Sequence, residues 1–497
     1  MKIAIDYNLD ENINIHNLDG HVAIVTGGNS GIGFSTAKHL VRLNCNVVMA
    51  CRSMDKCDTA VKEIQSLFPQ NAHLINPMLL DLNDLQSIYN FTTLFKSKYQ
   101  RLDYLINNAG LVAPVGRRTK QGLEELIGSM HIGHFALTKW LLDFMIKPIE
   151  NNDNMMNPSR IINVASEAFI VGNFHPTIFN ENGKGDFEGE VTDNCPIQYG
   201  FMPCCPMNAC PYTNGYSRAK LANIFHLQEL QKRYDEFVYD YTHNKQQSGH
   251  SILNEQTKQP NPLPFRRLVT ASLHPGAVQT NIAPLLKNSP HFMRDTDEAA
   301  YVVLYAIFDD SYIPSSFIDS MKGNHDLIHY QQFGLEKHLA TFGPFIHSLP
   351  FVKKATGYAL DVKGNFSMHS YAWDRTTFIQ PMIPELEGKS NTEIAHLVKI
   401  RLWDISENIV ANWMNGEKDL LGTPVTTIPF SLTLPTTSTS AAVREEEKEQ
   451  VTEVVVADSK ERGEEVADHV NQPEQSSNEE AAPQQVTEYE PDANEEL

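Results

Sequence analysis

Long apolar runs and a surplus of basic residues are both missing from this sequence of 497 residues. No segment reaches the roughly 18 consecutive apolar residues that a membrane-spanning helix needs. Lysine and arginine number 40 against 61 aspartate and glutamate, a formal net charge of −21. A nucleic-acid-binding chain needs a basic surface. We therefore expect no transmembrane segment and no nucleic-acid partner.

Cysteine is scarce, and seven cysteines in a chain of this length do not make a disulfide scaffold. Four of them, Cys195, Cys204, Cys205 and Cys210, could in principle hold zinc. Zinc ribbons use C-x2-C pairs, which are missing here, so we expect no metal. The first 20 residues are polar and acidic and resemble neither a secretory signal nor a transit peptide. The expected location is cytoplasmic.

The negative charge is concentrated at the C-terminal end. Residues 441–497 carry 18 acidic and 4 basic side chains, a net charge of −14. From residue 435 onward the chain is rich in Glu, Gln, Ser and Pro and poor in aromatics, a composition that cannot bury a core. We expect a disordered acidic tail over 435–497, preceded by a linker over 416–434. The first 17 residues form an N-terminal extension.

Between these ends, short apolar β-branched runs alternate with helical periodicity, which predicts a parallel sheet with helices on both faces. The fold class is therefore α/β, a Rossmann-type doubly wound sheet. The expected strands lie at 21–28, 45–52, 77–82, 102–110, 159–166 and 265–276, and the expected helices at 33–43, 58–68, 124–145 and 216–233.

Three weakly periodic stretches interrupt this alternation, near 173–213, 235–264 and 317–387. Sheet-forming segments lie on both sides of the first two. We interpret all three as insertions in one catalytic domain that covers 18–415.

A glycine-rich turn, TGGNSGIG, joins the first strand to the first helix. Glycine permits a sharp turn and a close approach to a pyrophosphate, and the helix N-terminus that follows suits an anion. A structural turn without a ligand is the alternative. The candidate cofactor residues in this turn are Gly27, Asn29, Ser30, Gly31, Ile32 and Gly33.

The ends of the second and third strands indicate which dinucleotide binds. A carboxylate after the second strand would hold the ribose of NAD, but this sequence has Arg52, which suits the 2′-phosphate of NADP. A solvated loop arginine is the alternative. Asp81 ends the third strand and could meet the adenine, or could serve as a cap or turn residue.

Tyr216 and Lys220 stand four apart on a predicted helix and therefore share a face. A nearby ammonium lowers the pKa of a phenol, which would suit proton transfer. Taken alone, the pair is more typical of an ordinary surface helix.

In combination, these motifs resemble the short-chain dehydrogenase/reductase family, and "YSRAKLAN", "HIGHFALT" and "HPGAVQTNI" resemble its retinol-dehydrogenase-like branch. The resemblance covers about 18–413. It implies that Tyr216 is the general acid or base, that Lys220 lowers the pKa of Tyr216 and holds the nicotinamide ribose, and that Ser166 binds the substrate oxygen. The other implied cofactor contacts are Asp81, Leu82, Asn108, Ala109, Gly110, Pro275, Gly276 and Thr280.

The resemblance implies an NADP-dependent oxidoreductase that interconverts an alcohol and an aldehyde or ketone, with NADPH favoured over NADH and a small lipophilic substrate. It also implies homo-oligomers. Peripheral membrane contact through the aromatic and lysine-containing segment 342–354 is an alternative to a packed loop.

Two departures from the family pattern qualify this interpretation. Met130 replaces the asparagine that the family uses in a proton relay, and a thioether cannot donate a hydrogen bond. Ser166 and Tyr216 are 50 residues apart, farther than in the family. The alternative function is therefore a catalytically weak or inactive NADP-binding scaffold or redox sensor.

Overall fold

The structure is a computed structural model, and all the residues that it describes fall within the unit Met1–Val454. The described residues are 17–112, 116–147, 157–166, 174, 177–180, 182–188, 210–247, 263, 265–276, 278, 295–308, 316–319, 386, 388–389 and 391–432. The expected tail, the segment 342–354, Thr280 and three of the four clustered cysteines lie outside them.

The predicted doubly wound sheet is confirmed. Seven parallel strands lie in the order β3-β2-β1-β4-β5-β6-β7. Their runs of Val, Ile, Leu and Ala are buried from end to end in β1, β4, β5 and β6, as expected for strands covered on both faces. The strands are β1 (Val22–Thr26), β2 (Asn46–Cys51), β3 (Ile75–Leu79), β4 (Tyr104–Asn107), β5 (Ser159–Val164), β6 (Leu268–His274) and β7 (Ser316–Asp319).

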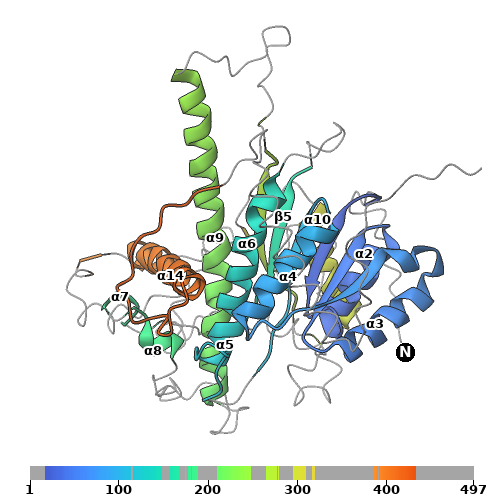
Figure 1. The fold of residues 1–497 in the computed structure, drawn as a ribbon, viewed down its shortest axis with the longest axis horizontal. Helices are drawn as coiled ribbons and strands as arrows, with labels where there is room; N and C mark the ends of the chain where they lie inside the picture. Colours follow the sequence, from blue (N-terminus) through green and yellow to red (C-terminus); the bar gives the residue numbers. More distant parts are fainter. Residues whose placement is uncertain are drawn as a thin grey trace, which may run out of the picture. The chain divides into compact units, whose positions relative to one another are not determined.

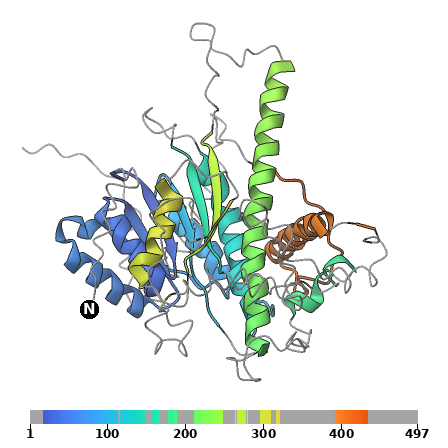
Figure 2. The same ribbon diagram turned by 180° about the vertical axis from the view of Figure 1, so that it is seen from behind.

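Three helices cover one face of the sheet: α2 (Gly31–Arg42), α3 (Met54–Leu67) and α10 (Thr296–Phe308). Their apolar sides, represented by Leu40, Ile64 and Val303, form one core with side chains from the strands. A 3-10 turn, η1 (Pro69–Leu74), leads from α3 into β3. Figure 2 shows α10 beside the two N-terminal helices.

The other face is covered by α4 (Leu85–Lys98), α6 (His134–Ile146) and α9 (Cys210–Gln247). A further helix, α14 (Asn391–Met414), packs outside them against α9 (Figure 1). The Trp403 ring of α14 lies 5.0 Å from the Phe135 ring of α6, between ring centroids. Two short helices, α7 (Thr177–Asn180) and α8 (Lys184–Phe187), lie inside the first predicted insertion.

The observed elements differ from the predicted ones in three places. The helix expected at 216–233 is α9, whose backbone extends into both neighbouring insertions. The helix expected at 124–145 is divided into α5 (Glu125–Ile127), a π-helical turn η2 (Gly128–Gly133) and α6. The third expected insertion begins with a strand, since β7 pairs with β6 over Ser316–Asp319.

A buried ion network lies at the amino ends of the strands, at the opposite end of the sheet from the candidate site. Asp103 accepts from Arg101 Nη2 and from Arg266 Nη2, both at 2.6 Å, and from the Val22 backbone N–H at 2.8 Å. Burial raises the pKa of Asp103, but the two guanidinium groups and the backbone donor together hold it below its usual value. The network ties the start of β1 to the start of β4.

Candidate functional site

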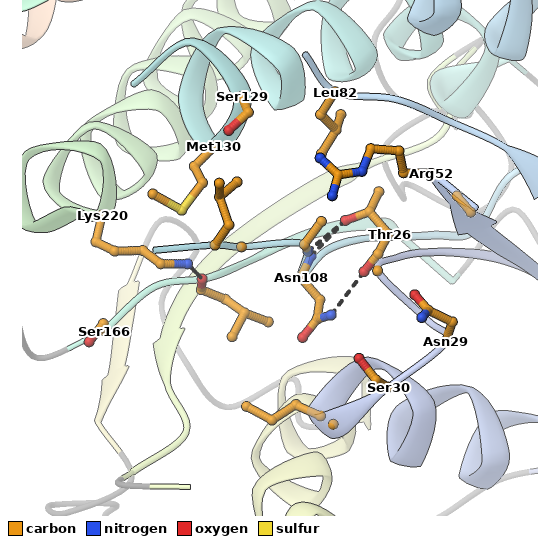
Figure 3. Close-up of a pocket in the computed structure, with 18 of the residues that line it drawn as sticks. Thr26, Asn29, Ser30, Arg52, Leu82, Asn108, Ser129, Met130, Ser166 and Lys220 are labelled. Atoms are coloured by element: carbon orange, nitrogen blue, oxygen red, sulfur yellow. Dashed lines mark hydrogen bonds between the residues drawn. The ribbon is translucent and has the colours of Figure 1, made fainter. Parts of the chain in front are cut away.

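A cavity of about 440 Å³ lies at the carboxyl ends of the strands, where the order reverses between β1 and β4 (Figure 3). Open α/β sheets bind their ligands at this kind of position. The cavity is lined by nearly every residue predicted for the site: Gly27, Asn29, Ser30, Gly31, Ile32, Arg52, Asp81, Leu82, Asn108, Ala109, Gly110, Ser166, Tyr216, Lys220, Pro275 and Gly276. Thr280 lies outside the described residues.

The glycine turn brings the backbone to the cavity wall. Gly27 and Gly31 have φ of 65° and 58°, a conformation that side chains other than glycine rarely adopt. A Cβ on Gly28 would lie 2.6 Å from Cγ of Met49. Gly33 does not line the cavity, because it faces the turn itself, where a Cβ would lie 2.5 Å from the Gly27 carbonyl oxygen. Gly33 therefore allows α2 to pack closely against the turn.

A buried chain of hydrogen bonds supports this turn from below. The Thr26 hydroxyl accepts from the backbone N–H groups of Asn108 and Ala109, both at 2.9 Å. His134 Nδ1 lies 2.9 Å from the Met130 carbonyl oxygen, which can only accept, so Nδ1 carries the proton. His134 Nε2, 3.0 Å from the Thr26 hydroxyl, must then accept. Burial lowers the pKa of His134 to about 4, which keeps the ring neutral.

Basic residues lie at one end of the cavity. Arg52, Ser53 and Lys56 follow β2 and line the cavity, and Figure 3 shows the Arg52 guanidinium turned into it. Sequence reasoning identified Arg52 but missed Lys56, which lies one helical turn further along and projects from the start of α3. Asp81 lines the cavity too, and its Oδ1 accepts from the Asn83 backbone N–H at 3.0 Å, so the predicted turn role is observed.

Two cysteines enclose this basic end. Cys51 ends β2 and Cys57 lies in the first turns of α3, and they are joined as a disulfide with their Cα atoms 6.0 Å apart. Both are buried, with exposed fractions of 2% and 0%. Sequence reasoning gave this pair no role, since their spacing of six matches no zinc or redox motif.

Ser166, Tyr216 and Lys220 gather at the other end of the cavity. The side chains of Ser166 and Tyr216 are hydrogen-bonded to each other. Lys220 is 3% exposed, and its Nζ donates to the Val164 carbonyl oxygen at 2.7 Å. Residues that are 50 apart in the sequence therefore meet, because Ser166 follows β5 and Tyr216 lies near the start of α9, and both line the cavity at the carboxyl ends of the strands.

The pKa of Tyr216 differs from the expectation. Burial raises the pKa of Tyr216, and the hydrogen bond from Ser166 offsets only part of this effect. The net shift is therefore upward, although Lys220 was expected to lower this pKa: its Nζ lies 5.6 Å from the centroid of the phenol ring and donates to the Val164 carbonyl oxygen. Burial lowers the pKa of Lys220 to about 8. At pH 7 the phenol is therefore protonated and the lysine is mainly charged.

Met130 lies in the π-helical turn η2 and lines the cavity. π-helical turns inside α-helices are frequent at functional sites. Ser129, beside it, lines the cavity as well, and its hydroxyl donates to the Glu125 carbonyl oxygen at 2.6 Å. Figure 3 shows Met130 on the same side of the cavity as Lys220. A π-helical turn cannot be read from periodicity over six residues, which is why sequence reasoning predicted one uninterrupted helix.

Two further features bear on the predictions. Within the described part of the chain, no three His, Cys, Asp or Glu side chains are arranged to hold a metal ion. Among the helices that the structure describes, none has the length and apolarity to cross a membrane.

Residues 21–179 match the sequence profile of the short chain dehydrogenase family. The chain is 40% identical over 155 residues to retinol dehydrogenase 13 of Homo sapiens, a match that covers 31% of this chain and 44% of that protein. It is 35% identical over 216 residues to retinol dehydrogenase 11 of Homo sapiens, with 44% and 57% covered. The chain thus spans about half the length of these curated relatives.

Solved structures with a similar fold include the Pseudomonas aeruginosa RhlG/NADP active-site complex. It is 17% identical, with a TM-score of 0.41, and 61% of this chain and 95% of that chain are covered. The sequence matches, rather than this likeness, carry the family resemblance. They show the short chain dehydrogenase pattern over residues 21–179 and a similarity of part of the chain to retinol dehydrogenases.

Proposed function

We propose that the chain is an NADP(H)-dependent oxidoreductase that interconverts an alcohol and an aldehyde or ketone. The observation that carries this proposal is a single cavity with a basic end at Arg52 and Lys56 and a Ser166–Tyr216 hydroxyl pair beside Lys220 at the other end. An elongated dinucleotide suits such a cavity, with its 2′-phosphate at the basic end and its nicotinamide beside the hydroxyl pair.

The residues that line the cavity fit this cofactor. A Cβ at position 27 or 28 would crowd Ala109 or Met49, so glycine lets the turn pack closely there and places its backbone at the cavity wall, where a pyrophosphate would bind. The turn precedes the N-terminus of α2, whose N–H groups and dipole favour an anion. When bound, the nicotinamide supplies or accepts the hydride equivalent that the reaction needs.

Tyr216 is the proposed proton donor. Its raised pKa keeps the phenol protonated at neutral pH, so it can donate a proton to a carbonyl oxygen during reduction. The Ser166 hydroxyl, hydrogen-bonded to the phenol, orients it and offers a second donor to the same oxygen. The charged Lys220 is buried beside the ring and stabilises negative charge that develops on the phenol oxygen.

The proposed substrate is lipophilic. Leu82, Leu111, Met130 and Val278 line the cavity and give it apolar surface. The names of the two human relatives, both retinol dehydrogenases, support the same class. We accordingly propose a retinoid-like or steroid-like alcohol or carbonyl compound.

Cofactor specificity is tested with Arg52→Asp. A charge-assisted hydrogen bond contributes about 1.5–3 kcal/mol, so NADPH binding should weaken about tenfold to a hundredfold while NADH binding changes little. Lys62→Asp is the matched control, because Lys62 is exposed on α3, the helix that follows Arg52, and does not line the cavity. Titration of nicotinamide fluorescence gives the dissociation constants of NADPH and NADH for the unaltered chain and for each variant. Equal losses for both nucleotides in Arg52→Asp would refute a 2′-phosphate contact.

The acid role is tested with Tyr216→Phe, which should lower turnover by about 10²-fold or more and leave NADPH affinity nearly unchanged. Tyr239→Phe on the same helix is the control, since Tyr239 is 60% exposed and lies outside the cavity. Full turnover in Tyr216→Phe would remove Tyr216 from the chemistry.

A second candidate function is a catalytically weak NADP-binding scaffold or redox sensor. Met130 favours it, since a thioether at the cavity wall cannot relay protons to Lys220. This alternative predicts tight NADPH binding, and equally low turnover in the unaltered chain and in Tyr216→Phe.

A further inference from the structure

The disulfide of Cys51 and Cys57 encloses the residues that line the basic end of the cavity. Arg52 and Ser53 lie between the two cysteines, and so does Lys56, directly before Cys57. The three cavity-lining residues are thus part of a short covalent ring that begins at the last residue of β2 and ends in α3. Reduction of the disulfide to two thiols opens this ring, and oxidation closes it.

The surroundings suit the dithiol as well as the disulfide. The Met49 carbonyl oxygen lies 3.3 Å from Cys57 Sγ and 3.9 Å from Cys51 Sγ. A carbonyl oxygen can accept from a thiol, which is a weak donor, so reduction leaves acceptors for both S–H groups. The Cα separation of 6.0 Å lies in the usual range for disulfides, so the backbone need not move for the bond to form.

Met49 also connects the pair with the glycine turn. Its Cγ would lie 2.6 Å from a Cβ on Gly28, so its side chain packs directly against the turn proposed to hold the pyrophosphate. The sulfurs, Met49 and the turn form one contiguous stretch of packed atoms. The positions of the basic loop, residues 52–56, and of the glycine turn therefore depend on how these atoms pack.

We propose that Cys51 and Cys57 are a reversible thiol–disulfide site that fixes the basic end of the cavity and sets its affinity for the 2′-phosphate of NADPH. This inference rests on the proposed function. The disulfide holds Arg52 and the first turn of α3 where they line the cavity, whereas the dithiol lets this loop sample other positions. A preorganised loop loses less entropy on binding.

The chemistry balances with a low-molecular-weight disulfide such as oxidised glutathione as the oxidant. One cysteine thiolate attacks a glutathione sulfur and displaces one glutathione thiolate, which leaves a mixed disulfide. The second cysteine thiolate then attacks the protein sulfur and displaces the other glutathione thiolate. The two protein thiols lose two electrons and two protons, and one oxidised glutathione becomes two reduced glutathiones. Because both sulfurs are buried, a local opening of the loop must precede each attack.

The test uses the full chain, equilibrated in oxidising or reducing glutathione buffer. NADPH and NADH are titrated in each buffer. Free thiols are then alkylated, and the protein is digested with trypsin. Because trypsin cleaves after Arg52 and Lys56, the disulfide form yields two peptides joined by sulfur, and the dithiol form yields them separately.

Two variants assign the effect to this pair. Cys57→Ala cannot form the bond, and the other cysteines remain in place. Cys45→Ala removes the buried free thiol that shares the tryptic peptide of Cys51, so a crosslink that persists in this variant must come from Cys51. The unaltered chain, measured in both buffers, needs no substitution and cannot fail through misfolding of a variant.

We expect NADPH to bind on the order of three to ten times more tightly to the oxidised chain, with little change for NADH. By linkage, bound NADPH should shift the thiol–disulfide equilibrium toward the disulfide by the same factor. Cys57→Ala should bind NADPH with the reduced-state affinity in both buffers, and Cys45→Ala should behave as the unaltered chain does.

Three results would overturn the inference: equal NADPH affinity in the two buffers although the pair is oxidised in one, no Cys51–Cys57 crosslink in the oxidising buffer, or a redox dependence that survives in Cys57→Ala. Failure of the proposed function has a different signature, since then neither nucleotide binds in either buffer. Without nucleotide binding there is no coupling between disulfide formation and NADPH affinity. The peptide map would still decide whether the two cysteines pair.

Discussion

Lys220 is a buried cation, and replacing it with methionine should change how stability depends on pH. Its side chain is 3% exposed, and burial lowers its pKa from 10.5 to about 8. The unfolded chain therefore binds more protons than the folded chain between about pH 8 and 10.5, so stability rises with pH across this window. Methionine has a similar length and no titrating group, so the Lys220→Met chain lacks this rise in stability with pH.

The magnitude follows from the pKa values. A shift of about 2.5 units corresponds to roughly 3 kcal/mol of unfavourable free energy when the lysine is charged in both states, below about pH 8. About 2 kcal/mol of this penalty should disappear between pH 7 and pH 9.5, because the unfolded lysine is still mostly charged at pH 9.5 and the folded one is not. The unaltered chain should gain this amount relative to Lys220→Met.

The assay is urea unfolding at pH 7, 8, 8.8 and 9.5, with the difference between the two chains as the readout. Other groups that titrate in this range are common to both chains and cancel in the difference. Lys62→Met is the control, since Lys62 is exposed and its replacement should give a difference that is flat with pH. Parallel curves for the unaltered chain and Lys220→Met would show that the folded lysine titrates normally, and the reasoning about its burial would be wrong.

Three further predictions concern the cavity wall, the glycine turn and the amino ends of the strands. Met130→Asn should raise the single-turnover rate, because asparagine can both donate and accept beside Lys220, and an unchanged rate would show that proton relay is not limiting. Gly33→Ala should weaken NADPH binding by tenfold or more in a fluorescence titration, because the new Cβ would lie 2.5 Å from the Gly27 carbonyl oxygen and displace the turn; normal affinity would refute that role. Asp103→Asn should lower the free energy of urea unfolding by about 3–5 kcal/mol, because it leaves Arg266, 1% exposed, with an uncompensated buried charge. A loss below 1 kcal/mol would contradict the stabilising role of that network.

The sheet and most of the cavity lining were predictable because each depends on local sequence. A strand such as 22–26 is buried along its whole length, and the glycines that follow it permit a tight turn. In a parallel sheet the strand ends meet at one edge, so residues that follow different strands, such as Arg52 and Ser166, had to line one cavity.

Other features depend on packing that no short pattern contains. The π-helical turn at Met130 is formed where the helix meets β1, with His134 bonded to Thr26 across 108 residues of sequence. The ends of α9 extend through polar residues, which a periodicity analysis assigns to a loop. The Lys220 ammonium bonds to a carbonyl oxygen of β5, so its effect on the pKa of Tyr216 could not be predicted from spacing alone.

The most direct test of the central claim is single-turnover oxidation of bound NADPH by the full chain, followed through the loss of nicotinamide absorbance. The carbonyl panel should contain lipophilic aldehydes and ketones, with retinal among them. We predict oxidation by at least one of these compounds, with the rate reduced about 10²-fold or more in Tyr216→Phe and unchanged in Tyr239→Phe. Tight NADPH binding with no oxidation across the panel would contradict the oxidoreductase assignment and favour the scaffold.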